Sequence, residues 1–391
     1  MSLNDRWLLP EGIEEILPEE AARLEGARRV LLDLYRSWGY ELVVPPLIEY
    51  LESLLTGTGP DLELQTFKLT DQISGRLMGV RADMTPQVAR IDAHRIRREG
   101  PTRLCYIDTV LKSRSDGFGG SRCPLQVGAE LYGHGGLDSE REILHLMLET
   151  CARFSLAPLH LDLGHIGILR ALTAEAGLDE DSEQQLFDML QRKAEPEIEE
   201  LLDRLALPAA QRNVLGALAH LHGGAAALAE ARSLLRDAGS AVNAALDALA
   251  ALVETVHEAF PEVEINIDLA ELRGYNYENG IVFALYVPGQ GQEIARGGRY
   301  DGLGKDFGRD RAAVGFSADL GTLLRLAPQA FASAPRRIFA PADVDPAVVR
   351  ALRASGDCVV GALAGQQADG RALGCGFQLV QQNAEWNVEA F

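Results

Sequence analysis

Length, composition and charge limit the classes of protein to which this chain can belong. It has 391 residues, 47% of them hydrophobic, which predicts two or three domains. A net charge of -20 argues against non-specific binding to nucleic acid, because neutralising phosphates requires a basic face. The five cysteines form no C-x-x-C pair, the N-terminus has no signal-peptide pattern, and no apolar run reaches the length of a membrane span. We therefore expect a cytoplasmic protein without membrane contact, metal or cofactor.

The N-terminal part of the chain alternates helical and extended patterns. Apolar spacing predicts a helix over 19–38, ended by Gly39 in the left-handed conformation that favours glycine. A strand over 40–46 follows and stops at two prolines. Residues 65–82 then have the pattern of a hairpin with Ser-Gly in its turn.

A carboxylate and a hydroxyl come next, immediately before a helix that begins near Pro86. Asp83 or Thr85 could cap that helix by accepting hydrogen bonds from its first amides. Taken alone, the segment favours this helix-cap interpretation over a role in binding.

The stretch 106–133 predicts an antiparallel hairpin with a long, Gly- and Ser-rich loop. Basic side chains in a loop above inward-facing polar groups are typical of a small-molecule site, but also of an ordinary solvated hairpin. The residues alone favour the solvated hairpin. The polar groups in question are Lys112, Arg114 and Arg122 in the loop, and Gln126 and Glu130 on one face of the returning strand.

The remaining chain predicts a helical insertion and a separate tail. Residues 166–258 are Ala- and Leu-rich with regular breaks, which indicates four to six helices. Extended character returns over 263–287. We expect a core domain over 1–330 that includes the insertion, and a small C-terminal α/β domain over 331–391.

Two further segments carry polar and aromatic residues close together: 272–280, LRGYNYENG, and 293–303, EIARGGRYDGL. By itself, the GGRYDG pattern is typical of a tight turn with a surface arginine.

In combination, these segments resemble the signature motifs of class II aminoacyl-tRNA synthetases, most closely those of histidyl-tRNA synthetase. The 106–133 hairpin resembles the second motif, and Val314-Gly315-Phe316 resembles the start of the third. The helix and strand of 19–46 resemble the first motif, which builds the family's dimer interface. The resemblance implies an α+β fold: a class II synthetase-like mixed or antiparallel sheet flanked by helices, with a helical insertion and a small C-terminal α/β unit.

The resemblance also implies a pocket for histidine. In the family, an acid and a Thr hold the substrate's amino group, an Arg reaches its carboxylate, and tyrosines surround the imidazole. The matching positions are Asp83, Thr85, Gln126, Glu130, Arg273, Tyr275, Tyr277 and Tyr300.

The groups that hold ATP in the family have changed in this chain. The family's motif-two Arg and Glu are replaced by Lys112 and Arg114, and its motif-three Arg by Thr322. Asp319 stands where the third motif has a glycine. Because phosphoryl chemistry depends on such positive groups, we predict a degenerate ATP site, no catalytic residues and no aminoacylation.

A retained histidine pocket beside a degraded ATP site resembles a known group of synthetase paralogues, the regulatory subunits of ATP phosphoribosyltransferase. The resemblance implies a non-catalytic homodimer that binds a short-form catalytic subunit in a hetero-octamer. L-Histidine would be the feedback inhibitor, held in the synthetase-like pocket or at a subunit interface, and we favour the pocket.

Two alternatives remain from the sequence. One is an active histidyl-tRNA synthetase in which Lys112 and Arg325 replace the missing arginines. The other is a histidine-sensing module that acts on a different partner.

Overall fold

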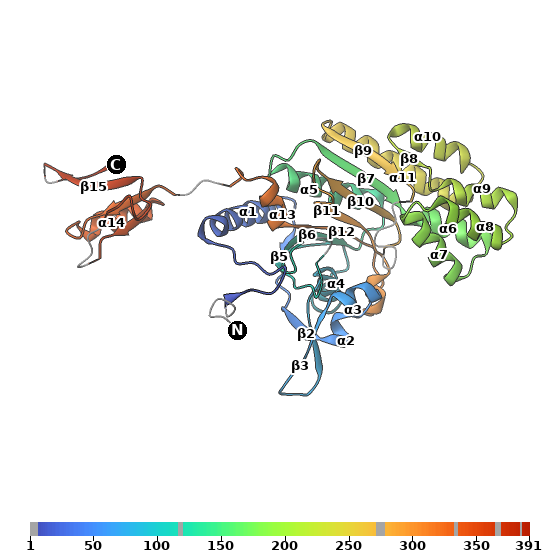
Figure 1. The fold of residues 1–391 in the computed structure, drawn as a ribbon, viewed down its shortest axis with the longest axis horizontal. Helices are drawn as coiled ribbons and strands as arrows, with labels where there is room; N and C mark the ends of the chain where they lie inside the picture. The colour runs from blue at the N-terminus through green and yellow to red at the C-terminus, as the bar shows by residue number, and fades with distance from the viewer. Residues whose placement is uncertain (1–6, 116–119, 271–277, 332–334, 364–368, 384) are drawn as a thin grey trace. The chain divides into compact units, whose positions relative to one another are not determined.

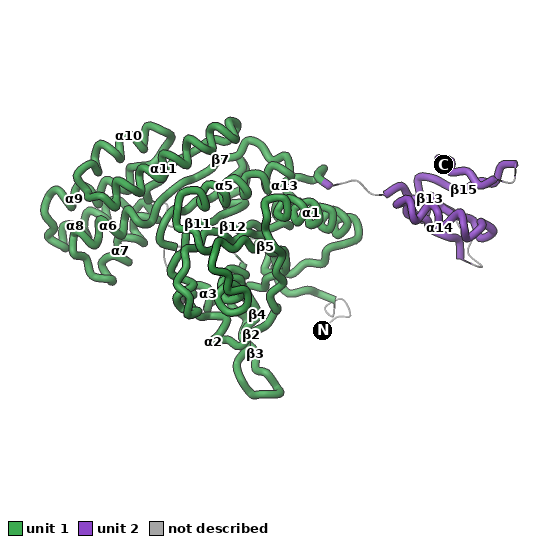
Figure 2. The backbone as a smooth tube through the Cα atoms, turned by 180° about the vertical axis from the view of Figure 1, so that it is seen from behind, with its two compact units in different colours: residues 1–330 green, residues 331–391 purple. Residues whose placement is uncertain are grey.

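The chain forms two compact units, 1–330 and 331–391 (Figure 2). The computed structural model describes residues 7–115, 120–270, 278–331, 335–363, 369–383 and 385–391. A large mixed sheet with flanking helices occupies the first unit, which confirms the predicted α+β class.

A nine-stranded sheet forms the centre of the first unit, in the order β1-β5-β6-β12-β11-β10-β7-β9-β8 (Figure 1). Neighbours are antiparallel except for two parallel pairs, β1 with β5 and β7 with β9. The central strands are buried along most of their length, which is typical of strands covered on both faces. The strands are β1 Glu41–Leu42, β5 Thr102–Thr109, β6 Leu125–Tyr132, β7 Leu159–His165, β8 His222–Gly223, β9 Val263–Asp268, β10 Ile281–Tyr286, β11 Ala295–Arg299 and β12 Ala313–Asp319.

Helices pack on this sheet through apolar faces. The predicted N-terminal helix is α1, Pro18–Ser37, which buries Leu31 and Tyr35, and the Tyr35 ring lies 6.3 Å from that of Phe316. The predicted glycine end is confirmed, because Gly39 has φ 84°. α5, Leu137–Ala152, packs on β6, β11 and β12 and contacts α1. α13, Leu320–Leu326, lies between α1 and the β6–β12 pair.

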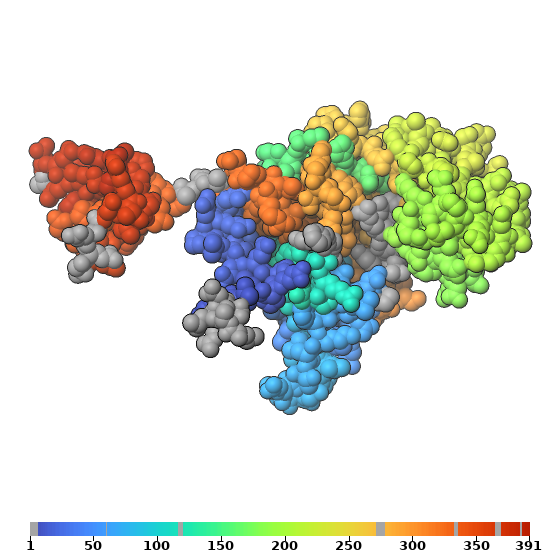
Figure 3. Space-filling view, viewed as in Figure 1, coloured from blue at the N-terminus to red at the C-terminus, as the bar shows by residue number. Residues whose placement is uncertain are grey.

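A three-stranded antiparallel sheet, in the order β2-β4-β3, projects from the first unit (Figure 1, Figure 3). It contains the predicted 65–82 hairpin, with Gly75 in its turn at φ 73°. The elements of this region are β2 Ile48–Tyr50, β3 Phe67–Thr70, β4 Leu77–Val80, α2 Leu51–Leu54, α3 Pro60–Gln65, α4 Thr85–Ile91, a π-helix Asp92–Ile96 and α12 Leu303–Asp306.

The predicted insertion contains six helices and the short strand β8, and it forms one lobe of the surface (Figure 3). Of the described helices, one, α11, is long and apolar enough to cross a membrane by length and composition. It packs on α5, α6, α10, β7 and β9, as a core helix does. The helices are α6 Ile166–Ala176, α7 Glu180–Gln191, α8 Glu195–Arg204, α9 Ala209–Ala217, α10 Ala225–Leu234 and α11 Gly239–Ala259.

The second unit is a four-stranded sheet, in the order β14-β13-β15-β16, with one helix. Ile338, Val359 and Leu379 form its buried core, and Val348 of the helix packs against them. The last strand was not predicted from the sequence, although EWNVEA alternates polar and apolar residues with the period of a strand. The elements are β13 Arg337–Ala340, α14 Pro346–Ala354, β14 Cys358–Gly361, β15 Phe377–Gln382 and β16 Glu385–Ala390.

Candidate functional site

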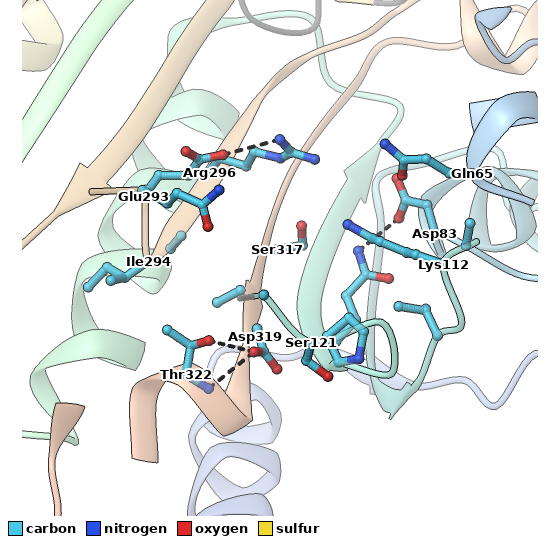
Figure 4. A pocket seen from close by; sticks show the side chains of 18 of the residues that line it. Gln65, Asp83, Lys112, Ser121, Glu293, Ile294, Arg296, Ser317, Asp319 and Thr322 are labelled. Carbon is cyan, nitrogen blue, oxygen red and sulfur yellow. Dashed lines mark hydrogen bonds and ion pairs between the residues drawn. The ribbon is translucent and has the colours of Figure 1, made fainter. Parts of the chain in front are cut away.

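A cavity of about 430 Å³ opens in the first unit where the β5–β6 hairpin meets the carboxyl end of β12 and the start of α13 (Figure 4). A concave site of this size, with a few converging polar groups, is typical of small-molecule binding. The polar side chains that line it include Asp83, Lys112, Gln126, Glu293, Arg296, Asp319, Thr322 and Arg325.

Asp83 and Gln126 form one wall of the cavity and fix each other in place. Gln126 Nε2 donates to Asp83 Oδ1 over 2.8 Å, and Gln126 Oε1 accepts from the Met84 amide over 2.9 Å. The Thr85 amide, the first of α4, also donates to Asp83 Oδ1 over 3.1 Å, so Asp83 makes the contact that the helix-cap interpretation expected and also lines the wall. Because both bonds to the carboxylate fall on Oδ1, Oδ2 takes part in neither and can accept from a ligand.

Behind this wall lies a buried cluster centred on Glu130, which is 1% exposed. Its carboxyl accepts from Thr85 Oγ1 over 3.2 Å, from the Tyr106 hydroxyl over 2.9 Å and from the Tyr300 hydroxyl. Burial raises the pKa of Glu130 to about 8, although these donors act to lower it. Glu130 is therefore joined to Asp83 through Thr85, but it supports the cavity wall instead of forming its surface.

Two glycines give this cluster its space: Gly315 the space of the Glu130 carboxyl, and Gly128 the space of the Tyr106 ring. A Cβ at Gly315 would lie 1.6 Å from Glu130 Oε2, and one at Gly128 would lie 2.4 Å from the Phe316 carbonyl oxygen. Gly315 pairs with Glu130 in the register of β12 and β6. Gly315, which matches the glycine of the third motif, is therefore required here because any side chain would overlap the Glu130 carboxyl.

Replacing Gly315 by Ala is expected to lower the free energy of unfolding by about 3 kcal/mol or more, because a methyl group would overlap a fully buried carboxyl. Urea unfolding of the purified variant measures this loss. Gly302→Ala is the matched control, since a Cβ there meets no atom within 4 Å. Equal stabilities of the two variants would contradict this steric account.

Cations also line the cavity, but not in the pattern that an ATP site requires. Lys112, Thr322 and Arg325 line the cavity, and Arg325 Nη2 donates to Thr322 Oγ1 over 2.7 Å. Arg325 therefore brings a positive charge to the wall from one helical turn further along. Arg114 is exposed and is not a lining residue.

Asp319 is a lining residue whose role was not predicted from the sequence. Its carboxylate accepts from the Gly321 amide over 3.1 Å, the Thr322 amide over 3.1 Å and Thr322 Oγ1 over 2.6 Å. Its position before a helix would have predicted a cap, but not a carboxylate at the cavity surface.

Two arginines from the recognised motifs have structural roles. Arg122 donates to the Lys112 and Glu11 carbonyl oxygens, which ties the hairpin loop to the N-terminal segment. Arg299, which the GGRYDG pattern placed on the surface, is instead 6% exposed and pairs with Glu140 over 2.6 Å. The surface interpretation of that motif was wrong because its strand, β11, is internal to the sheet.

The predicted site residues therefore separate into three groups. Asp83, Gln126, Lys112 and Thr322 line the cavity, while Thr85, Glu130 and Tyr300 form the hydrogen-bonded cluster behind it. Arg273, Tyr275 and Tyr277 lie outside the described residues.

The fold and the cavity define a class II synthetase-like protein of the histidyl type. A family model described as histidyl-tRNA synthetase matches residues 12–323, and one described as the C-terminal domain of the ATP phosphoribosyltransferase subunit HisZ matches residues 335–389. The chain is 61% identical to a protein of Thioalkalivibrio sulfidiphilus and 53% identical to one of Ectopseudomonas mendocina, covering 99% of each chain in both cases. Both relatives are named ATP phosphoribosyltransferase regulatory subunit. The chain belongs to this family of regulatory subunits, as its sequence predicted.

Solved structures agree with this placement. An ATP phosphoribosyltransferase regulatory subunit/histidyl-tRNA synthetase from Bacillus halodurans superimposes with a TM-score of 0.82 at 28% identity, over 94% of this chain and 95% of that one. Histidyl-tRNA synthetase from Nostoc shares the fold, with a TM-score of 0.77 at 18% identity over 98% of this chain and 97% of that one.

Proposed function

We propose that the chain acts as the non-catalytic regulatory subunit of an ATP phosphoribosyltransferase in histidine biosynthesis. It binds the short catalytic subunit, is required for that subunit's activity and transmits inhibition by histidine. The observation that carries this proposal is the similarity to regulatory subunits along 99% of the chain, tail included. The complex is cytoplasmic, where the five unpaired cysteines remain reduced.

L-Histidine is the effector, and the cavity is its site. The Asp83 carboxylate suits an ammonium group because charge-assisted hydrogen bonds are the stronger ones. Gln126 and Thr85 hold Asp83 before the ligand arrives, which reduces the ordering cost of binding. Lys112, which lies near Asp83 at the cavity surface (Figure 4), supplies a cation for the ligand carboxylate.

The same cavity is poorly suited to activating an amino acid with ATP. Of the three changed positions, Lys112 lacks the two-pronged geometry of arginine, Thr322 lacks charge, and Arg114 is exposed. Removing one group that stabilises transition-state charge typically costs about 3–4 kcal/mol. This argues against the active-synthetase alternative, in which Lys112 and Arg325 would serve instead.

Two assays on one sample of the purified chain test this division of roles. Saturable histidine binding without histidine-dependent ATP–pyrophosphate exchange is the expected result. Robust exchange would mean that the chain is an active synthetase. Neither exchange nor binding would place the histidine site at a subunit interface of the assembled complex.

The regulatory subunit forms a homodimer within a hetero-octamer, through the apolar edge of the first unit. β1 lies at one end of the large sheet and β2 at one end of the small sheet. The exposed fractions of Val44, Leu47 and Ile48 are 70%, 49% and 43%. Exposed apolar side chains beside free sheet edges are typical of an interface, and a second copy offers the same surface to itself.

Val44→Asp is expected to convert the dimer to a monomer, because two like charges would be buried at a self-complementary contact. Light scattering after size-exclusion chromatography measures the mass. Leu234→Asp, at a position 42% exposed on α10 of the insertion, is the control and should leave the mass unchanged. A Val44→Asp protein that remains dimeric would place the interface elsewhere.

A further inference from the structure

The charged groups around the cavity are balanced. Three carboxylates and three cations line it among the described residues: Asp83, Glu293, Asp319, Lys112, Arg296 and Arg325. Glu293 pairs with Arg296 over 3.2 Å, so this pair adds little net charge. A site with this balance suits a ligand that carries one positive and one negative group.

Asp319 determines the balance of positive and negative charge on the wall formed by α13. Without it, this wall would present the Arg325 cation and the Thr322 hydroxyl, while Lys112 lies beside Asp83 on the other side of the cavity (Figure 4). A cavity with these two cations and no carboxylate beside Thr322 would attract an anion with several negative charges. With it, a carboxylate stands beside the hydroxyl to which Arg325 donates.

The three hydrogen bonds to Asp319 hold this charge in place. Gly321 donates to Oδ1, while the Thr322 amide and hydroxyl both donate to Oδ2, so neither oxygen can turn away without losing a bond. Asp319 is half-buried at the junction of β12 and α13 and lines the cavity there.

We propose that Asp319 determines the ligand specificity of the cavity by excluding polyphosphates such as nucleotides while admitting a small zwitterion. A nucleotide brings several negative charges to one place, and a fixed like charge in a partly dry cavity opposes each of them. The negative charge of Asp319 therefore repels polyphosphates, and this repulsion adds to the loss of the phosphate-binding arginines. This inference concerns the cavity of the proposed function, but it does not depend on histidine being the ligand.

The test is a titration of the full chain with ATP at low ionic strength, monitored by calorimetry. Asp319→Asn removes the charge and keeps one oxygen, which can accept from one of the two amides, because Asn is as good a helix cap as Asp. Wild type is expected to bind ATP with a dissociation constant in the millimolar range or weaker. Asp319→Asn is expected to bind at least tenfold more tightly, with a gain that shrinks as salt is added.

Asp179→Asn is the matched control. Asp179 caps α7 in the insertion by accepting from the Ser182 amide over 2.8 Å, so the same chemical change occurs at a helix start away from the cavity. Submicromolar to micromolar binding of ATP by wild type would overturn the proposal, as would equal ATP affinities of wild type and Asp319→Asn. A gain in Asp179→Asn equal to that in Asp319→Asn would also overturn it. Histidine titrations of the same samples report on the proposed function separately.

Discussion

Asp83→Asn is expected to weaken histidine binding by about 10- to 150-fold, since a hydrogen bond to a charged group contributes roughly 1.5–3 kcal/mol and the ligand ammonium would lose its counter-charge. The Asn oxygen can still accept from Gln126 and the Thr85 amide, as Oδ1 of Asp83 does. Its amide nitrogen would then occupy the place of Oδ2 and present a donor to an ammonium that is itself a donor. Calorimetric titration of the purified chain measures the change.

Inhibition of the assembled enzyme by histidine should disappear in the same variant, with the complex still formed, because Asp83 lines the cavity and not the exposed edge at β1 and β2. Asp71→Asn, at the tip of the β3–β4 hairpin, makes the same chemical change away from the cavity and should leave both binding and inhibition intact. Unchanged inhibition in Asp83→Asn would assign histidine to a different site.

The second large effect concerns the pH dependence of stability, which Glu130 should dominate between pH 6.5 and 8. The pKa of this buried carboxyl is about 8 in the folded chain, against an ordinary value of 4.5. Between these values the folded chain holds a proton that the unfolded chain has released, so the free energy of unfolding falls as pH rises. The expected fall from pH 6.5 to 8 is about 2 kcal/mol, at roughly 1.4 kcal/mol per pH unit.

Two partly buried histidines act against this fall in the free energy of unfolding at lower pH. Burial lowers the pKa of His165 to about 4 and also lowers that of His145, so the unfolded chain binds more protons there. Their contribution makes stability rise with pH up to about 6.5, the ordinary histidine value. Below pH 6.5 this rise offsets most of the fall due to Glu130, so the profile is expected to be nearly flat below pH 6.5 and to fall above it.

Glu130→Gln removes the titrating group and retains an oxygen for the tyrosine hydroxyls, so it should abolish the fall above pH 6.5. Urea unfolding across pH 5 to 8.5 measures both profiles. Glu262→Gln, at an exposed position, should keep the profile of the wild type. An identical fall in the Glu130→Gln and wild-type proteins would show that Glu130 is ionised in the folded chain.

Local patterns were sufficient to predict much of the architecture. Gly39, the Ser-Gly turn before β4 and the 106–133 hairpin depend on residues close in sequence, and each was found where expected. The six-helix insertion followed from apolar spacing and regular breaks. Strand β16, which pairs with β15, was missed although its residues alternate polar and apolar with the period of a strand.

The site was harder to predict because its properties depend on contacts between distant segments. Glu130 was placed on the correct face of its strand, but its burial results from Tyr106, Tyr300 and Gly315, which come from three other segments. The buried position of Arg299 depends on Glu140, which is 159 residues away.

Asp319 illustrates the same limit at a single residue. The sequence identified it as a departure from a glycine motif, whereas its role depends on Arg325, one turn along α13, and on Lys112, which meets it only across the cavity. The charge of a site is a property of the assembled walls, and no local pattern contains it.

The most direct test of the proposed function is reconstitution with a purified short catalytic ATP phosphoribosyltransferase subunit. Activity of the mixture is measured with and without histidine, beside each subunit alone. We predict that neither subunit is active alone, that the mixture forms a hetero-octamer with activity, and that histidine inhibits it. A catalytic subunit that neither binds this chain nor changes its activity in its presence would contradict the regulatory role and favour a histidine sensor for another partner.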